Sequence, residues 1–260
     1  MLKRLVGVIT IKDGWAVQSI GYGRYLPLGR PEIIAENLDR WFLDEILVSV
    51  IDRSAQNAGP DMELVSRIAA RNLMTPLAYG GGVRGTEDAL ELVKRGADRI
   101  CLEALFERGP DQCRAVRDAI GIQATIRALP VIKTEQGVGH YSYLSGQVQP
   151  VDPLGLQDAA NPIFSELLVI DKTHDGGDAN FDETLIAPFA NAGYQIIAFG
   201  GISTKTQVQS LFSNPHVSGV AVGNSLSYRE LANRDLVSFT EMHDTRYTTH
   251  GEQTKGAREW

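Results

Sequence analysis

Three glycine-rich turns in the second half of the chain carry residue types that bind anions. They are Asp175-Gly176-Gly177, Gly200-Gly201 and Gly223-Asn224-Ser225, and the last two directly follow short apolar runs. Adjacent glycines let backbone N–H groups approach a phosphate closely, and a helix that begins after the turn adds its positive end. If the turns meet at one end of the fold, we expect a phosphate-binding cup. Taken singly, each glycine pair is equally an ordinary turn.

A corresponding turn in the first half, Gly80-Gly81-Gly82, predicts a second phosphate site, but a carboxylate follows it. The next predicted strand leads into Cys101-Leu102-Glu103-Ala104. An ionised Glu103 would repel a phosphate, since two like charges a few ångströms apart cost kilocalories in a poorly hydrated cleft. We therefore expect one intact phosphate cup in the second half. At the altered site in the first half, Glu103 is expected to bind a hydroxyl or a cationic nitrogen instead.

Regular elements must position these turns, and the sequence alternates between two patterns. Amphipathic stretches such as PEIIAENLDRWF, GTEDALELVKRG and TKTQVQSLFSN predict helices. Short β-branched runs predict strands at residues 5–11, 45–51, 77–79, 99–102, 124–127, 166–170, 195–199 and 219–222. Strand followed by helix, repeated about eight times, is typical of a parallel sheet closed into a (β/α)₈ TIM barrel. The loops that follow the strands of such a barrel carry its chemistry.

The two halves of the chain resemble each other. GGV at residues 81–83 recurs as GGI at 200–202, and IDRS at 51–54 recurs as IDKT at 170–173, both at a spacing of 119 residues. A period of half the chain predicts a barrel built from two half-barrel repeats, the alternative being chance similarity between βα turns. We place the single barrel at residues 1–235 and a polar C-terminal tail at 236–260. Residues 131–162 are long and polar without a clear helix, and predict an enlarged βα loop in which Tyr141 and Tyr143 could form a lid.

The composition and charge of the chain argue against several classes of protein. The formal net charge of −7 and a pI near 5.3 argue against nucleic-acid and membrane-surface partners. The two cysteines, Cys101 and Cys113, fit a reducing compartment, and the start of the chain is no signal peptide, so we expect a cytoplasmic protein. His140 and His174 are isolated, and no metal-ligand spacing occurs. We therefore expect neither a metal site nor a cofactor.

Several segments resemble the cyclase subunit of imidazole glycerol phosphate synthase, over about residues 1–235. They are KDG at 12–14, PLAYGGGVRGTEDALELVKRGAD at 76–98, HDGGDANFD at 174–182 and AFGGIS at 198–203. The resemblance implies a (β/α)₈ barrel of two half-barrel repeats. It also implies a heterodimer with a glutaminase (HisH-like) subunit that docks at the lower face of the barrel. Ammonia from that subunit passes up the barrel to a phosphorylated small-molecule substrate.

The family has a ring of four alternating charges at the barrel floor, which acts as an ammonia gate. The matching residues here are Arg4, Glu45, Arg99 and Glu166, with Arg99 in place of the usual lysine. Any one of them alone would be an ordinary charge at a strand start, but four buried charges must pair with one another. Asp98 matches an aspartate of the glutaminase interface. The resemblance thus implies that ammonia delivery is kept.

The same resemblance implies that the proton chemistry is changed. The family cyclises its substrate with two aspartates, on the first and fifth strands, acting as general acid and base. Thr10 and Pro130 stand at the matching positions here, and neither can shuttle a proton near pH 7. Gln18 replaces a lysine partner, and Glu103-Ala104 replaces an Asn-Thr pair. We therefore expect imidazole formation to be lost.

Three acids remain as candidate catalytic residues: Asp175, Glu103 and Asp52. Asp175 lies beside the first phosphate turn, where it could orient a substrate hydroxyl, accept a proton or merely cap the next element. Asp52, with Arg53, could hold a polar group of a ligand or be a plain surface pair. Arg127 points either into the barrel mouth or into the helical layer, since side chains alternate along a strand.

Three functions remain open. GYGRYLPLGRPEII at residues 21–34 resembles a loop of family paralogues that lack the catalytic aspartates and are associated with surface-polysaccharide sugars. The leading interpretation is therefore a synthase-like lyase or amidotransferase subunit that channels ammonia for amination or amidation of a phosphorylated or nucleotide-linked sugar. A separate sugar amidotransferase would be a further partner. The second is a genuine cyclase subunit of histidine biosynthesis using relocated acids such as Asp175 and Glu135, and the third is a non-catalytic partner that activates the glutaminase.

Overall fold

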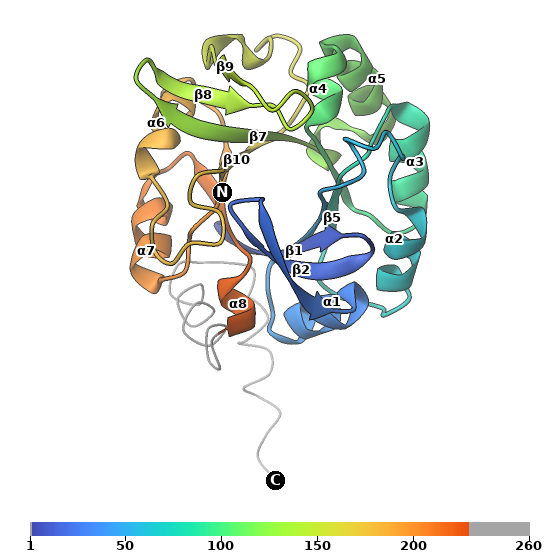
Figure 1. The fold of residues 1–260 in the computed structure, drawn as a ribbon. Coiled ribbons are helices and arrows are strands. Elements are labelled where there is room, and N and C mark those ends of the chain that lie inside the picture. The colour runs from blue at the N-terminus through green and yellow to red at the C-terminus, as the bar shows by residue number, and fades with distance from the viewer. Residues whose placement is uncertain (1, 229–260) are drawn as a thin grey trace.

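The computed structural model describes residues 2–228, and the predicted tail at 236–260 lies outside them. Eight parallel strands close into a barrel, in which each strand pairs with the next and the last pairs with the first. In order they are β1 (Arg4–Lys12), β4 (Glu45–Val50), β5 (Leu77–Gly80), β6 (Arg99–Leu102), β7 (Thr125–Thr134), β10 (Glu166–Asp171), β11 (Ile196–Phe199) and β12 (Val217–Val222). The predicted TIM barrel is confirmed (Figure 1).

Helices form a layer around the barrel (Figure 1). They are α1 (Pro31–Arg40), α2 (Met62–Ala69), α3 (Thr86–Lys94), α4 (Ala104–Arg108), α5 (Pro110–Ile120), α6 (Ala187–Asn191), α7 (Lys205–Ser213) and α8 (Ser225–Tyr228), with short 3₁₀ turns at Ile122–Ala124, Leu154–Leu156 and Glu183–Leu185. In α2 the Asp61 carboxylate accepts a hydrogen bond from the Leu64 N–H, which caps the helix, while Leu64 and Ile68 are buried against the sheet. No helix between residues 2 and 228 has the length and apolar character needed to cross a bilayer.

Alternation along the strands divides the core into two layers. One set of buried side chains faces the helices, among them Leu5, Ile9 and Ile11 of β1. The other set fills the barrel interior, among them Val6 and Val8 of the same strand. The interior set consists of Val6, Val8, Leu47, Ala78, Cys101, Ile126, Ala128, Leu168, Ile170, Ile197, Phe199 and Ala221. The barrel axis between floor and mouth is therefore apolar.

The backbone supports the two half-barrel repeats. Gly81 and Gly82 have φ angles of 122° and 73°, and their counterparts Gly200 and Gly201 have 109° and 73°. A Cβ on Gly81 would lie 2.1 Å from the carbonyl oxygen of the last residue of β4, and one on Gly200 would lie 2.5 Å from that of β10. Both turns require glycine for the same steric reason, because a side chain would collide with backbone and strain φ.

The fifth βα unit departs from the prediction. The strand expected at 124–127 continues to Thr134, and the chain returns antiparallel as β8 (Gly137–Tyr141) and β9 (Val148–Pro150) instead of forming an irregular loop. Pro130 lies within this longer strand, although proline removes a ladder hydrogen bond. However, β6 pairs with β7 only as far as Arg127, so Pro130 lies where one edge of the strand is unpaired. A proline is tolerated there.

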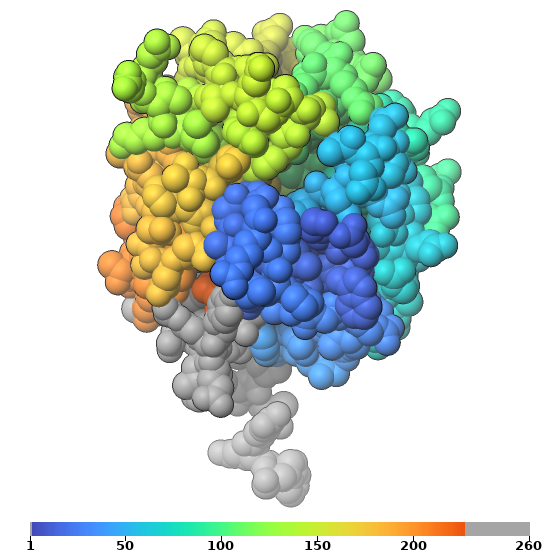
Figure 2. Space-filling view, viewed as in Figure 1, coloured from blue at the N-terminus to red at the C-terminus, as the bar shows by residue number. Residues whose placement is uncertain are grey.

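A second antiparallel hairpin, β2 (Trp15–Ile20) with β3 (Arg24–Gly29), follows β1. At its tip Tyr22 adopts φ 54°, and its ring packs against the cluster that fills the barrel interior. The blue N-terminal part of the chain, which contains this hairpin, occupies the middle of the face shown in Figure 2. The first βα loop thus covers part of the barrel mouth.

Candidate functional site

The three glycine turns of the second half meet at the barrel mouth. They enclose a small recess of about 20 Å³ at the carboxyl ends of β1, β10, β11 and β12. Its lining includes Thr10, Asp175, Gly176, Gly177, Gly200, Gly201, Gly223, Asn224 and Ser225. The structure therefore brings together the glycine turns from which the sequence predicted a phosphate cup, and we refer to this set, after that prediction, as the phosphate cup.

Glycine is required at the centre of the cup. Gly176 and Gly201 both have φ 73°; a Cβ on Gly176 would lie 2.2 Å from the Ser19 carbonyl oxygen, and one on Gly201 2.4 Å from Asn180 Oδ1. Among the described residues, the backbone N–H groups of Gly176 and Gly201 have no hydrogen-bond acceptor. Clustered free N–H groups at a βα turn are suited to an oxyanion.

Asp175 joins this cup to the β2–β3 hairpin. Its Oδ2 accepts hydrogen bonds from Ser19 Oγ at 2.6 Å and from the Tyr22 N–H at 3.2 Å, and its carbonyl oxygen accepts one from the Gly21 N–H at 2.9 Å. Burial raises the pKa of Asp175, and the bonds from Ser19 and Tyr22 partly oppose that rise. Asp175 therefore holds the hairpin in place as well as lining the cup.

The corresponding region of the first half is built differently. The Gly82 N–H, placed like that of Gly201, donates to Ser54 Oγ at 3.0 Å. Gly80, Gly81 and Ser54 line a larger cavity of about 170 Å³ instead of a glycine cup. The expectation that the two halves differ thus agrees with the geometry.

Glu103 forms part of the wall of this larger cavity. Its Oε1 is buried and has no hydrogen-bond partner among the described residues. Burial, aided by the nearby Glu107 carboxylate, raises the pKa of Glu103 to about 7. At neutral pH the carboxyl group is consequently present in both protonation states.

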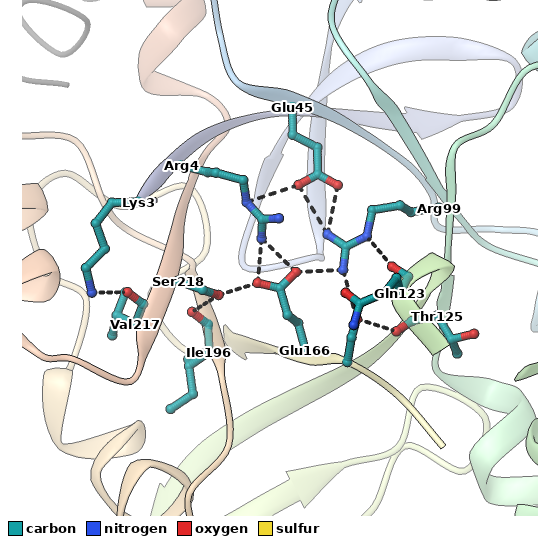
Figure 3. Close-up of polar contacts among 11 residues, drawn as sticks. Lys3, Arg4, Glu45, Arg99, Gln123, Thr125, Glu166, Ile196, Val217 and Ser218 are labelled. Atoms are coloured by element: carbon teal, nitrogen blue, oxygen red, sulfur yellow. Dashed lines mark hydrogen bonds and ion pairs between the residues drawn. The ribbon is translucent and has the colours of Figure 1, made fainter. Parts of the chain in front are cut away.

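The four predicted gate residues meet at the barrel floor (Figure 3). Arg4 lies 2.5 Å from Glu166 and 3.6 Å from Glu45, while Arg99 lies 2.6 Å from Glu166 and 3.1 Å from Glu45. Each arginine therefore pairs with both glutamates, and each glutamate with both arginines. These four residues form a closed ring of alternating charge, which we call the floor ring.

Additional hydrogen bonds stabilise the floor ring. Ser218 Oγ donates to Glu166, and Arg99 donates to the Gln123 carbonyl oxygen at 3.1 Å and to Ser165 Oγ at 3.2 Å. Burial alone would raise the pKa of Glu166, but Arg4 and Arg99 outweigh it and the pKa is lowered. Losing one member would leave an uncompensated buried charge, which costs about 3–5 kcal/mol in proteins.

Other candidate residues lie apart from the two recesses. Asp98 is exposed at the floor, where its Oδ2 accepts from the Leu77 N–H at 2.8 Å. Asp52 does not line either recess; its Oδ2 accepts from the Asp13 N–H at 2.6 Å, while its Oδ1 is buried and has no partner in the part of the chain that the structure describes. Arg127 lies over the Phe106 ring at 4.3 Å, in the helical layer. Its alternative orientation, into the mouth, is not adopted.

The two residues that the resemblance places at catalytic positions, Thr10 and Pro130, face the mouth but bring no acid to it. Thr10 lines the phosphate cup, and Pro130 lines the larger cavity. Glu135, proposed as a relocated acid, is exposed at the turn between β7 and β8. Among the described acids, Glu103 and Asp175 are the carboxylates that line the two recesses.

Sequence reasoning missed the polar residues that support these groups. Ser19 and Tyr22 bind Asp175 across 156 and 153 residues of chain, and Ser218 binds Glu166 across 52. Such contacts leave no local pattern in the sequence. Of these supporting residues, Ser54 could have been found from the sequence, because it belongs to the repeated IDRS segment. In the structure it accepts a hydrogen bond from Gly82, in the glycine turn of its own half.

Comparison with known proteins supports the resemblance to the cyclase subunit of imidazole glycerol phosphate synthase. The family model described as histidine biosynthesis protein matches residues 4–232. The imidazole glycerol phosphate synthase subunit HisF of Natranaerobius thermophilus is 25% identical over 244 residues, covering 92% of this chain and 96% of that protein. A putative subunit hisF2 of Vibrio vulnificus is 30% identical over 211 residues (80% and 77%), and HisF of an Exiguobacterium species is 30% identical over 213 residues (80% and 82%). The chain therefore belongs to the histidine biosynthesis protein family, with HisF subunits of imidazole glycerol phosphate synthase among its relatives.

Proposed function

We propose that this protein is the ammonia-channelling barrel subunit of a two-component glutamine amidotransferase. A HisH-like glutaminase docks at the floor, around Asp98, and the ammonia serves amination or amidation of a phosphorylated or nucleotide-linked sugar in surface-polysaccharide biosynthesis. The observation that carries the proposal is the floor ring, which closes one end of an apolar barrel. Opening it admits a small neutral molecule, whereas the apolar interior beyond it disfavours ions.

The mouth supports a chemistry other than ring closure. Thr10 and Pro130 replace the proton carriers expected there, while the phosphate cup is kept. A barrel with the floor ring at one end and the glycine turns at the other, but without these two acids, is suited to delivering ammonia to an acceptor. A separate sugar amidotransferase at the mouth would complete the reaction.

The test replaces half of the floor ring. In a strain that lacks the chromosomal gene, the Arg4→Ala, Glu45→Ala double variant should lower amide incorporation into surface polysaccharide at least about tenfold, and added ammonium should restore it. The control is Arg40→Ala with Glu36→Ala, an ion pair of the same types on the outer surface of α1 at 2.5 Å. Unchanged amide incorporation in the folded ring variant would refute channelling through the floor.

A second candidate, a genuine cyclase subunit, is favoured by one observation. Glu103 and Asp175 both line the mouth and both have a raised pKa, as proton carriers near neutral pH require. Growth of a histidine auxotroph that expresses this chain with its glutaminase would establish that function. Stimulation of the glutaminase without affinity for any sugar phosphate would instead indicate a non-catalytic activator.

A further inference from the structure

The larger cavity at the mouth has a lining that the ammonia-delivery role does not explain. It lies over β4, β5, β6, β7 and β10 and includes the rings of Tyr22, Tyr25 and Tyr143 together with Glu103. The Tyr22 and Tyr143 rings are 5.3 Å apart between centroids and inclined at 59°. No lysine, arginine or histidine is among its described lining residues. The cavity therefore offers aromatic faces and one carboxyl group, without a cation to balance a phosphate.

Two polar atoms of this lining are buried without partners. Glu103 Oε1 and the Tyr143 hydroxyl have no hydrogen bond among the described residues. A buried polar group left unpaired destabilises the fold, and such groups in a folded protein call for an explanation. A ligand with hydroxyl groups would supply both missing partners.

The chemistry favours an uncharged hydroxyl over a phosphate or an ammonium group. A hydroxyl both donates and accepts, so it pairs with Glu103 in either protonation state, and with Tyr143, whose raised pKa keeps its hydroxyl neutral. A phosphate would meet a carboxylate and find no cation. A cationic nitrogen donates hydrogen bonds but has no lone pair, so it cannot accept one from the Tyr143 hydroxyl or from protonated Glu103.

The cavity is joined to the phosphate cup through one residue. The Tyr22 ring lines the cavity, while the Tyr22 N–H donates at 3.2 Å to Asp175, which lines the cup. In the first half, by contrast, the Gly82 N–H already donates to Ser54. One ligand spanning the mouth would therefore meet an anion site at one end and the carboxyl and phenol groups of Glu103 and Tyr143 at the other.

We propose that the mouth binds a monophosphorylated sugar, with its phosphate in the cup and the hydroxyl groups of its ring against Glu103 and Tyr143. The apolar face of the sugar ring packs on the tyrosines. This inference rests on the proposed function and names the class of acceptor for it. A bisphosphorylated ligand is disfavoured by the charge of Glu103.

Calorimetric titration of the full chain tests the assignment with four probes: inorganic phosphate, glucose 6-phosphate, glucosamine 6-phosphate and fructose 1,6-bisphosphate. We expect glucose 6-phosphate to bind at least about tenfold more tightly than phosphate and more tightly than the other two sugars. Tyr143→Phe, which removes one hydroxyl, should weaken its binding about fivefold to tenfold. Glu103→Gln should change that affinity little and should improve binding of the bisphosphate.

The control is Tyr194→Phe, a tyrosine that precedes β11 at the opposite end of the barrel and should leave all four affinities unchanged. The inference is refuted if glucose 6-phosphate binds no more tightly than inorganic phosphate, if Tyr143→Phe leaves its affinity unchanged, or if the amine or bisphosphate probe binds best. Calorimetry measures sugar phosphate binding without the glutaminase. Such binding can therefore be found even if the floor-ring variants give no evidence of ammonia channelling, and channelling can be found even if no sugar phosphate binds. The two proposals therefore fail separately.

Discussion

The Glu103 carboxyl group should make the stability of this protein depend on pH in a way that one substitution removes. Its pKa rises from an ordinary 4.5 to about 7 in the folded chain, first because of burial and second because of Glu107. Between these two pH values the folded state holds a proton that the unfolded state has released. The free energy of unfolding therefore falls as pH rises from about 4.5 to about 7 and stays low above that.

The structure sets the size of this effect. Each pH unit between the two values corresponds to about 1.4 kcal/mol, so the loss at pH 8 is at most about 3.5 kcal/mol. Because part of the Glu103 surface faces the cavity, where water can relax around the charge, we expect about 1–3 kcal/mol. Glutamine keeps the size and polarity of the protonated acid, and Glu103→Gln should remove the loss.

Urea unfolding of both proteins at pH 5 and pH 8 measures the effect. Glu103→Gln should match the unsubstituted chain at pH 5 and should be more stable at pH 8. Contributions of other titrating groups are common to the two proteins and cancel in the difference. Glu135→Gln is the control, since that exposed carboxylate is hydrated in folded and unfolded chains alike. A stability difference that is the same at both pH values would show that Glu103 ionises as freely as an exposed acid.

Three further predictions concern the supports of the two ends of the barrel. Gly201→Ala and Gly82→Ala should each destabilise the fold by about 1–3 kcal/mol, because both glycines have φ 73° and an added Cβ would meet a neighbour within 2.5 Å. Only Gly201→Ala should abolish phosphate binding, which calorimetry measures. Asp175→Ala should release the β2–β3 hairpin and speed amide hydrogen exchange at residues 15–29, and unchanged exchange would contradict the role given to its bonds. Ser218→Ala should cost about 1–3 kcal/mol in thermal unfolding by removing a hydrogen bond to Glu166; a cost near zero would mean that the two arginines alone satisfy that carboxylate.

The fold could be predicted because its signals are local. Alternating β-branched and amphipathic runs gave the order of strands and helices, and the 119-residue repeat gave the two halves, whose glycine turns have matching φ angles. The prediction was wrong in the fifth unit, where β7 continues past Pro130 and pairs with β8. Whether a proline interrupts a strand depends on which edge is paired, and only the assembled sheet decides that.

For the candidate site, the sequence by itself determined the kinds of groups available: glycine turns for an anion, four alternating charges, and no acid at Thr10 or Pro130. These follow from residue identity and spacing along regular elements. The tertiary structure alone decided that Arg127 faces the helical layer, that Asp175 holds the hairpin, and that Glu103 Oε1 has no partner within residues 2–228. The physical reason is that hydrogen bonding and burial depend on contacts between residues far apart in the chain, which local spacing does not record.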